Sequence, residues 1–238
     1  MKPVDQLKVR LFADGADKKG MLEMYRLPYV KGFTTNPTLM RKVGIADYEA
    51  FARDILAAIP DRSISFEVFA DDSSEMERQA RRIAPWGKHV SVKIPIMNTK
   101  KESTIPLVRK LSRDGIALNV TAMFTLEQVQ DVVDAVKGGA PCFVSVFAGR
   151  IADTGRDPVP LMAEAVKRLK AAPNTELIWA SPRELLNIYQ ADEIGCQVIT
   201  VTNDILKKLS LRDKNLADYS LETVRMFYDD ASAAGFRI

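Results

Sequence analysis

Eight short segments rich in β-branched and other apolar residues are spread along this chain, and amphipathic stretches separate them. The eight predicted strands cover residues 9–14, 30–36, 63–69, 89–95, 116–121, 142–147, 176–181 and 197–202. Strands that alternate with helices indicate parallel βα units. Eight such units are the number that closes a (β/α)₈ barrel, the TIM barrel, so we predict this α/β fold.

The stretches between the strands predict the outer helices of the barrel. Those with the clearest amphipathic pattern cover residues 47–58, 73–83, 103–112, 126–136, 158–170 and 182–191. The main competing fold is an open, doubly wound sheet, which ordinarily has a glycine-rich phosphate turn after its first strand. Here that turn is DGADKKG, which matches neither GxGxxG nor GxxxxGK[ST]. We therefore favour the closed barrel.

The chain has the length expected of one barrel with a helical addition. It contains 238 residues and no linker rich in Pro, Gly or Ser, so we predict a single domain over residues 1–238. Residues 216–238 form one helix more than the barrel needs, with an apolar stripe of Leu221, Val224, Phe227 and Tyr228. This stripe packs either on its own barrel or on a neighbouring subunit, and the sequence leaves both alternatives open.

Composition excludes several classes of protein. The 34 Lys+Arg against 31 Asp+Glu give a net charge of +3, which demands neither nucleic acid nor a membrane as partner but permits small anionic ligands. Two cysteines cannot form a disulfide scaffold, and the single histidine argues against a multi-histidine metal site. There is no apolar run for a signal peptide or a spanning helix. We expect a cytoplasmic protein without a metal.

The polar residues of the predicted strands alternate with aliphatic ones. Because successive side chains of a strand point to opposite faces, the aliphatic face suits burial under the helices and the other face points into the barrel. On this inner face Asp14, Glu67 and Lys93 come from the first, third and fourth strands. Burying all three in an inert barrel would be costly without compensating partners, so we favour a chemical role.

Lys93 is the best candidate for a nucleophile. It lies in SVKIP between Val92 and Ile94, and an amine held away from water can attack a carbonyl in its neutral form. This is what Schiff-base catalysis requires, with neither a metal nor a cofactor. Of Asp14 and Glu67, one carboxylate can act as a base directly, and the other through a water held by the Thr121 hydroxyl.

Two further sets of polar side chains fit substrate binding. Short neutral groups suited to holding substrate hydroxyls are Asn36, Asn119 and Ser145. Groups suited to clamping a phosphate on the late loops are Arg150, Ser181 and Arg183. Either arginine alone could instead form a surface ion pair.

Six segments resemble, in the same order, the signature segments of the transaldolase family. They are FTTNP (33–37), SFEVF (65–69), SVKIP (91–95), LNVTAMF (118–124), SVFAGRI (145–151) and ASPRE (180–184). The resemblance covers almost the whole chain. It implies a class I, metal-independent barrel without a cofactor that acts on sugar phosphates in the pentose phosphate pathway. It also implies a homo-oligomer, either a pentamer or a decamer.

The resemblance also assigns roles. It implies that Lys93 forms the Schiff base, that Asp14 is the acid/base at the substrate C4 hydroxyl, and that Glu67 and Thr121 hold a catalytic water. The residues implied to bind the dihydroxyacetone part are Asn36, Asn119 and Ser145, and those implied to bind phosphate are Arg150, Ser181 and Arg183.

Two positions separate the relatives within this family. The fructose-6-phosphate aldolases carry Gln and Tyr where this chain has Glu67 and Phe147 in its substrate site. Both residues here are similar to those of the transaldolases, which transfer a dihydroxyacetone unit between sugar phosphates. The first alternative is an aldolase of the fructose-6-phosphate type. The alternative from another class is a barrel that binds a sugar phosphate without catalysis.

Overall fold

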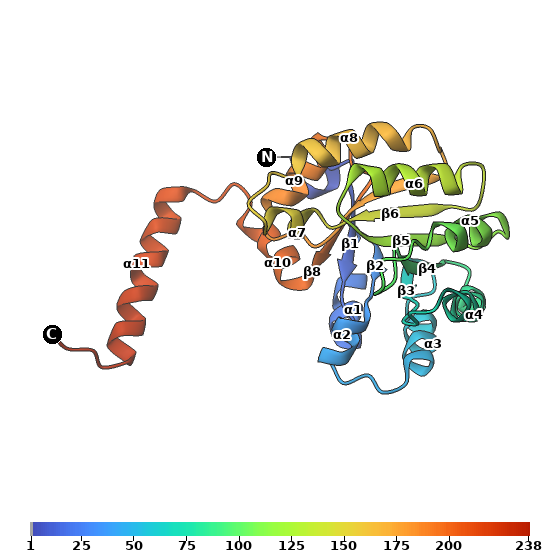
Figure 1. Cartoon of the computed structure of the whole chain (residues 1–238). Coiled ribbons are helices and arrows are strands. Elements are labelled where there is room, and N and C mark those ends of the chain that lie inside the picture. The colour runs from blue at the N-terminus through green and yellow to red at the C-terminus, as the bar shows by residue number, and fades with distance from the viewer. Residues whose placement is uncertain (1) are drawn as a thin grey trace.

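The computed structural model of the chain describes residues 2–238 and contains a closed barrel of eight parallel strands (Figure 1). Each strand pairs with the next in chain order, and β8 pairs with β1. The strands are β1 Arg10–Asp14, β2 Val30–Thr34, β3 Ser63–Glu67, β4 Val90–Pro95, β5 Leu118–Met123, β6 Cys142–Val146, β7 Thr175–Trp179 and β8 Val198–Thr202. The predicted fold class is confirmed, and every predicted strand overlaps an observed one.

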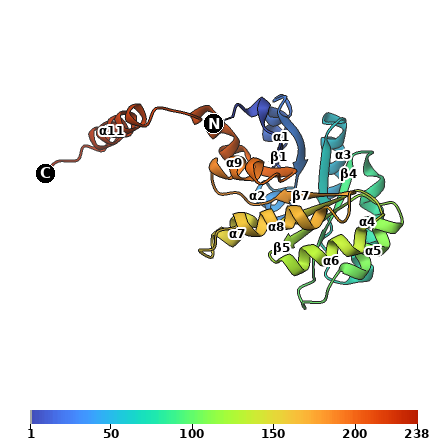
Figure 2. The same cartoon turned by 90° about the horizontal axis from the view of Figure 1, so that it is seen from above.

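Helices follow the strands and cover the outside of the barrel (Figure 2). They are α1 Lys18–Tyr25, α2 Pro37–Lys42, α3 Tyr48–Ala58, α4 Ser73–Ile83, α5 Ile105–Arg113, α6 Leu126–Val136, α7 Ala148–Ala152, α8 Val159–Leu169, α9 Leu186–Glu193 and α10 Asn203–Lys207. Three short 3₁₀ segments are Val4–Gln6, Ala84–Trp86 and Lys208–Leu211. The aliphatic strand faces are buried in the core cluster together with the apolar sides of these helices.

Local hydrogen bonds explain two of the predicted ends that were wrong. The second strand ends two residues earlier than predicted because Asn36 caps α2, accepting a hydrogen bond from the backbone N–H of Leu39 at 3.0 Å. Helix α9 begins at Leu186, not at residue 182. The Asn187 side chain accepts from the backbone N–H groups of Arg183 and Glu184, which keeps these two residues out of the helix.

The barrel interior has an apolar middle layer and a polar upper end. Phe12, Ile178, Ala180 and Val198 form a separate interior cluster, and Phe143 and Phe147 pack against it. The rings of Phe12 and Phe143 meet edge to face at 5.7 Å between centroids. Above this apolar layer a cavity opens at the C-terminal ends of the strands, where barrel enzymes place their chemistry.

The additional C-terminal helix α11 spans Leu216–Ala233 and extends away from the barrel (Figures 1 and 2). None of its residues is buried, and the stripe of Leu221, Val224, Phe227 and Tyr228 is exposed. Of the two alternatives that the sequence left open, packing on its own barrel is therefore not found. No helix among residues 2–238 has both the length and the apolar character needed to cross a membrane.

Candidate active site

A buried ion pair joins Lys93 and Glu67 at the top of neighbouring strands. The two residues are register partners between β3 and β4, and Nζ lies 3.1 Å from Glu67 Oε2. The Lys93 side chain is only 7% exposed, and its Nζ also donates to the backbone carbonyl of Thr35 at 3.1 Å. The amine thus has two acceptors in a site from which bulk water is largely excluded.

Asp14 ends β1 and shares the cavity with Lys93. Its Oδ1 accepts a hydrogen bond from the Thr34 hydroxyl at 2.7 Å. Burial raises the pKa of Asp14, and the charge of Lys93 and the Thr34 hydrogen bond oppose this rise only in part. A carboxylate with a raised pKa is a stronger base than an ordinary aspartate, which suits it to proton transfer.

The polar ends of the strands enclose a cavity. Its wall is formed by Asp14, Thr34, Asn36, Lys93, Thr121, Ser145, Phe147, Arg150, Ala180, Ser181 and Thr200. Eight of these are residues that the sequence nominated. The three nominated residues outside the wall are Glu67, Asn119 and Arg183, each of which touches a residue of the wall.

Thr121 offers an unused hydroxyl to this cavity. The residue is 1% exposed, and its Oγ1 has no hydrogen-bond partner within residues 2–238. The following residue, Ala122, has a left-handed backbone (φ 61°) where the β5–β6 register shifts. A buried hydroxyl without a protein partner usually binds water or a ligand group, so this is a natural position for a bound water.

Asn119 lies behind the cavity wall. It is fully buried, donates from Nδ2 to Ser65 Oγ at 3.0 Å, and accepts at Oδ1 from Ser145 Oγ at 2.7 Å. Because Ser145 lines the cavity and Asn119 does not, Asn119 can orient a group that touches substrate.

Arg150 and Arg183 lie at the other end of the site and differ in their surroundings. Arg150 lines the cavity from α7, with its guanidinium carbon 5.3 Å from the centre of the Phe147 ring. Arg183 instead forms an ion pair with Asp153, donating from Nε to Oδ1 at 2.9 Å and from Nη2 to Oδ2. Its Nη1 donates to Ser181 Oγ at 3.2 Å, which links it to the cavity wall.

Close backbone packing brings Arg150 and Ser181 together. A Cβ at Gly149 would lie 1.5 Å from the carbonyl oxygen of Ser181, so only glycine allows α7 to pack here. Ser181 itself has a left-handed backbone, with φ 61°. The glycine therefore sets the distance between α7 and the loop after β7.

Two polar residues of the cavity wall, Thr34 and Thr200, were missed in the sequence. They lie on β2 and β8, and alternation on these strands would have identified them. Residues two apart on a strand share a face. Thr34 shares its face with Gly32, which faces the interior ring of Phe12, and Thr200 shares its face with Val198 of the interior cluster.

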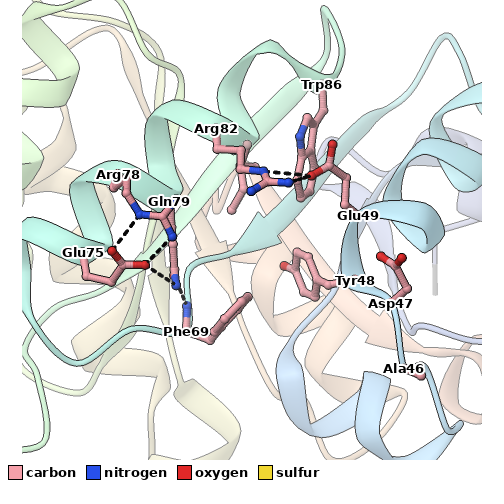
Figure 3. A pocket seen from close by; sticks show the side chains of 11 residues that line it. Ala46, Asp47, Tyr48, Glu49, Phe69, Glu75, Arg78, Gln79, Arg82 and Trp86 are labelled. Carbon is pink, nitrogen blue, oxygen red and sulfur yellow. Dashed lines mark hydrogen bonds and ion pairs between the residues drawn. The ribbon is translucent and has the colours of Figure 1, made fainter.

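A second hollow lies between α3 and α4 and is shown in Figure 3. Its charged residues neutralise one another, as in the pairs Glu75–Arg78 and Glu49–Arg82. Tyr48 in its wall donates to the backbone carbonyl of Glu67 at 2.8 Å and so braces the end of β3. Unlike the barrel cavity, this hollow does not bring a lysine and an acid together.

Neither a metal cluster nor an activated thiol is present in the described part of the chain. Residues 2–238 contain no group of three or more His, Cys, Asp or Glu that could hold a metal ion. Cys142 and Cys196 are free and buried, and burial raises the pKa of each thiol to about 12. They are therefore poor nucleophiles.

The structure is a (β/α)₈ barrel with a lysine and two carboxyl groups at the C-terminal ends of its strands. Solved structures of this shape include an HpcH/Hpal aldolase/citrate lyase family protein from Burkholderia cenocepacia J2315, with a TM-score of 0.56 and 14% identity, covering 92% of this chain and 95% of that one. A mandelate oxidase superposes with a TM-score of 0.58 and 13% identity, over 85% of this chain and 67% of the oxidase chain. At such identities the likeness concerns the fold alone.

Sequence comparison is more specific. A profile of the family described as Transaldolase/Fructose-6-phosphate aldolase matches residues 11–238. A probable transaldolase of Dehalococcoides mccartyi is 36% identical over 215 residues, covering 89% of this chain and 96% of the relative. One from Thermoanaerobacter sp. is 32% identical over 231 residues, covering 97% of this chain and 100% of the relative. The chain belongs to the transaldolase/fructose-6-phosphate aldolase family and is an enzyme of this kind.

The raised pKa of Asp14 predicts a pH-dependent effect on stability. The stability that Asp14 contributes is fully present below its unfolded pKa and is lost as the pH rises through the folded pKa. We expect Asp14→Asn, which cannot ionise, to gain in Tm relative to the wild type as the pH rises above the unfolded pKa of about 4, until the folded pKa is passed. Thermal unfolding across this range measures the difference.

Asp153→Asn is the matched control, because the hydrogen bond from Arg183 lowers the pKa of Asp153. Its contribution is present above the unfolded pKa and is lost as the pH falls, so the loss of Tm in this variant should shrink towards acid pH. An Asp14→Asn difference that is flat with pH would contradict the raised pKa.

Proposed function

We propose that this enzyme is a transaldolase that transfers a dihydroxyacetone unit between sugar phosphates through a Schiff base on Lys93. The observation that carries the proposal is the buried Lys93 amine, which is paired with Glu67 and shares its cavity with Asp14. No other lysine lines this cavity in the described part of the chain.

In the first step the Lys93 Nζ attacks the C2 carbonyl of a ketose phosphate. The carbon–nitrogen bond forms, the carbonyl oxygen takes a proton, and that hydroxyl later leaves as water to give the imine. Glu67 at 3.1 Å can accept the amine proton and return it to the leaving hydroxyl. A water held by the Thr121 hydroxyl is the carrier that the resemblance implies, and the unpartnered hydroxyl supports this position.

In the second step Asp14 takes the proton of the C4 hydroxyl. The C3–C4 bond breaks, its electron pair moves into the iminium, and the aldose phosphate leaves while the enamine stays on the lysine. Addition of this enamine to an acceptor aldose phosphate reverses the sequence, with Asp14 returning the proton. Covalent catalysis thus divides one difficult transfer into two easier steps.

The remaining polar groups fit substrate binding. Asn36 and Ser145 lie in the wall near Lys93 and can hold the hydroxyls of the dihydroxyacetone part, with Asn119 orienting Ser145. Arg150 and Ser181 lie in the same wall, and the Nη1 of Arg183 is bonded to Ser181. A phosphate between them would receive charge-assisted hydrogen bonds from both arginines.

Phe147 supports transfer over release of dihydroxyacetone. Its ring packs between Arg150 and Phe124, at 5.3 Å from the Arg150 guanidinium carbon and 5.9 Å from the Phe124 ring centre. A ring without a hydroxyl adds no proton donor beside Lys93 and leaves proton transfer to Glu67. An aldolase of the fructose-6-phosphate type is the second candidate, and the product assay below separates the two.

The exposed stripe of α11 supports a homo-oligomer. A continuous apolar face left in water is a liability on a monomer, and this helix covers nothing of its own barrel. We place the stripe against a neighbouring subunit. A surface that gives a helix to one neighbour and receives a helix from another forms a heterologous contact, and such contacts form a ring when the rotation between subunits closes. Following the resemblance of its sequence motifs, we propose a pentamer or a decamer. Family membership also supports a cytoplasmic enzyme of the pentose phosphate pathway.

Borohydride trapping tests the reaction itself. We expect reduction in the presence of fructose 6-phosphate to add a three-carbon unit to Lys93, detected by peptide mass spectrometry. Lys93→Met should stay unlabelled. With erythrose 4-phosphate present, a new seven-carbon phosphate should form. Free dihydroxyacetone as the main product would identify the aldolase, and no label at all would leave the non-catalytic barrel.

The phosphate site predicts a loss that depends on the substrate. Arg150→Ala or Arg183→Ala removes a charge-assisted contact and should raise KM for the phosphorylated ketose by roughly 10–150-fold. The unphosphorylated ketose should lose much less. Arg156→Ala is the matched control, since Arg156 donates to the Thr154 hydroxyl at 3.1 Å and does not line the cavity. Equal losses for both ketoses would assign these arginines a structural role instead.

Removal of α11 tests the assembly. We expect light scattering to show an oligomer for the full chain and a smaller species for a chain that ends at Asn215. Phe227→Asp on the exposed stripe should weaken the oligomer, whereas Asp229→Ala should not. A full-length monomer, or a truncated chain with the same mass per assembly as the full chain, would contradict the exchange of this helix.

A further inference from the structure

A pair of buried threonines stands directly behind Asp14. Thr34 on β2 is the register partner of Asp14, and Thr200 on β8 lies beside β1 at Phe12. Both are nearly fully buried, at 2% and 5% exposed, and both line the cavity. The Thr34 hydroxyl donates to Asp14 Oδ1 at 2.7 Å, and the hydroxyls of Thr34 and Thr200 are hydrogen-bonded to each other. The Thr200 hydroxyl, the Thr34 hydroxyl and the Asp14 carboxyl group are therefore linked in that order by two hydrogen bonds.

The number of available protons decides which group donates in each of these two hydrogen bonds. An ionised carboxylate only accepts hydrogen bonds, and a threonine hydroxyl has a single proton to donate. The proton of Thr34 is used on Asp14, so the proton between the two threonines must come from Thr200. Thr200 thus prevents the Thr34 hydroxyl from turning away from the carboxylate.

We propose that Thr34 and Thr200 are positioning residues that fix the Asp14 carboxylate for proton transfer, with Oδ1 held by the hydroxyl chain and Oδ2 left for the substrate. This inference rests on the proposed role of Asp14 as the base at the C4 hydroxyl. Within residues 2–238, Thr34 is the one hydrogen-bond donor that accompanies this carboxyl group. Neither threonine is needed for bond making or breaking, and neither transfers a proton to substrate.

The charged groups around Asp14 lie on β3, β4 and α7, and none of them belongs to the strands that carry the two threonines. Lys93 on β4 acts on it through its charge and is itself paired with Glu67 on β3, while Arg150 on α7 lines the same cavity. The residues contributed by β2 and β8 are uncharged hydroxyls. Replacing a threonine therefore removes a hydrogen bond and leaves every charge in place. A shift in the titration of Asp14 in such a variant is then caused by the lost hydrogen bond.

The first test is the pH profile of kcat/KM for the phosphorylated ketose. On the acid side of this profile, kcat/KM should rise with pH as Asp14 ionises, and we call this rise the acid limb. Thr34→Val removes the hydrogen-bond donor to the ionised Asp14 carboxylate, so the acid limb should move to higher pH by roughly 1–2 units. Thr200→Val should move the acid limb in the same direction by less, because this variant removes the hydrogen bond from Thr200 to Thr34 and keeps the one from Thr34 to Asp14. Thr34→Ser and Thr200→Ser keep the hydroxyl and should keep the wild-type limb. If either valine variant fails to fold, Thr34→Ala and Thr200→Ala make the same comparison.

Thr175→Val is the matched control for loss of a buried hydroxyl. Thr175 is 7% exposed at the start of β7, and its hydroxyl donates to the Ala172 carbonyl at 2.6 Å, at the end of the barrel away from the cavity. This variant should lower Tm and leave the acid limb unchanged. A purely structural role of Thr34 would give the same result as Thr175.

A second measurement does not depend on turnover. Carbon NMR of the substrate-free protein, with Asp14 assigned from Asp14→Asn, should show the Asp14 titration moving upward in Thr34→Val and less so in Thr200→Val. An unchanged titration in Thr34→Val would overturn the proposal. If the protein neither transfers nor cleaves a sugar phosphate, the proposed function fails. The NMR titration of Asp14 in the threonine variants then still decides whether the threonines hold the carboxylate.

Discussion

The buried ion pair between Lys93 and Glu67 is the interaction on which the rest of the site depends. Two charges taken out of water are tolerated only with good partners, and adjacent parallel strands in register provide them. The Thr35 carbonyl adds a second acceptor for the amine. The barrel therefore holds the Lys93 side chain in place before any substrate arrives, and the chemistry we propose follows from this arrangement.

The barrel separates stability from chemistry along its axis. The middle of the interior is filled by apolar side chains such as Phe12 and Phe143, whereas the strand ends above it carry the acids, the lysine and the hydroxyls. Gly149 lets α7 pack directly on the Ser181 carbonyl, so the end of the cavity that carries Arg150 is set by backbone packing. The end that carries Asp14 is set by the side-chain hydrogen bond from Thr34 to Asp14.

Much of the site followed from alternation alone. Asp14, Glu67 and Lys93 were expected on the inner face because side chains alternate along a strand, and all three lie at the cavity or in contact with its wall. The same rule, applied to β2 and β8, would have found Thr34 and Thr200. Alternation gives the face of a strand but not the depth of a side chain, and so it could not show that Asn119 lies behind Ser145.

By itself the sequence determined the barrel, the inward lysine and acids, and the presence of α11, because these depend on periodicity and on the number of βα units. The tertiary structure alone decided which groups meet across the chain. It paired Arg183 with Asp153, joined Thr200 to Thr34, and left the α11 stripe in solvent instead of on its own barrel. Such contacts join residues far apart in sequence, and local patterns carry no information about them until the strands close and bring the side chains together.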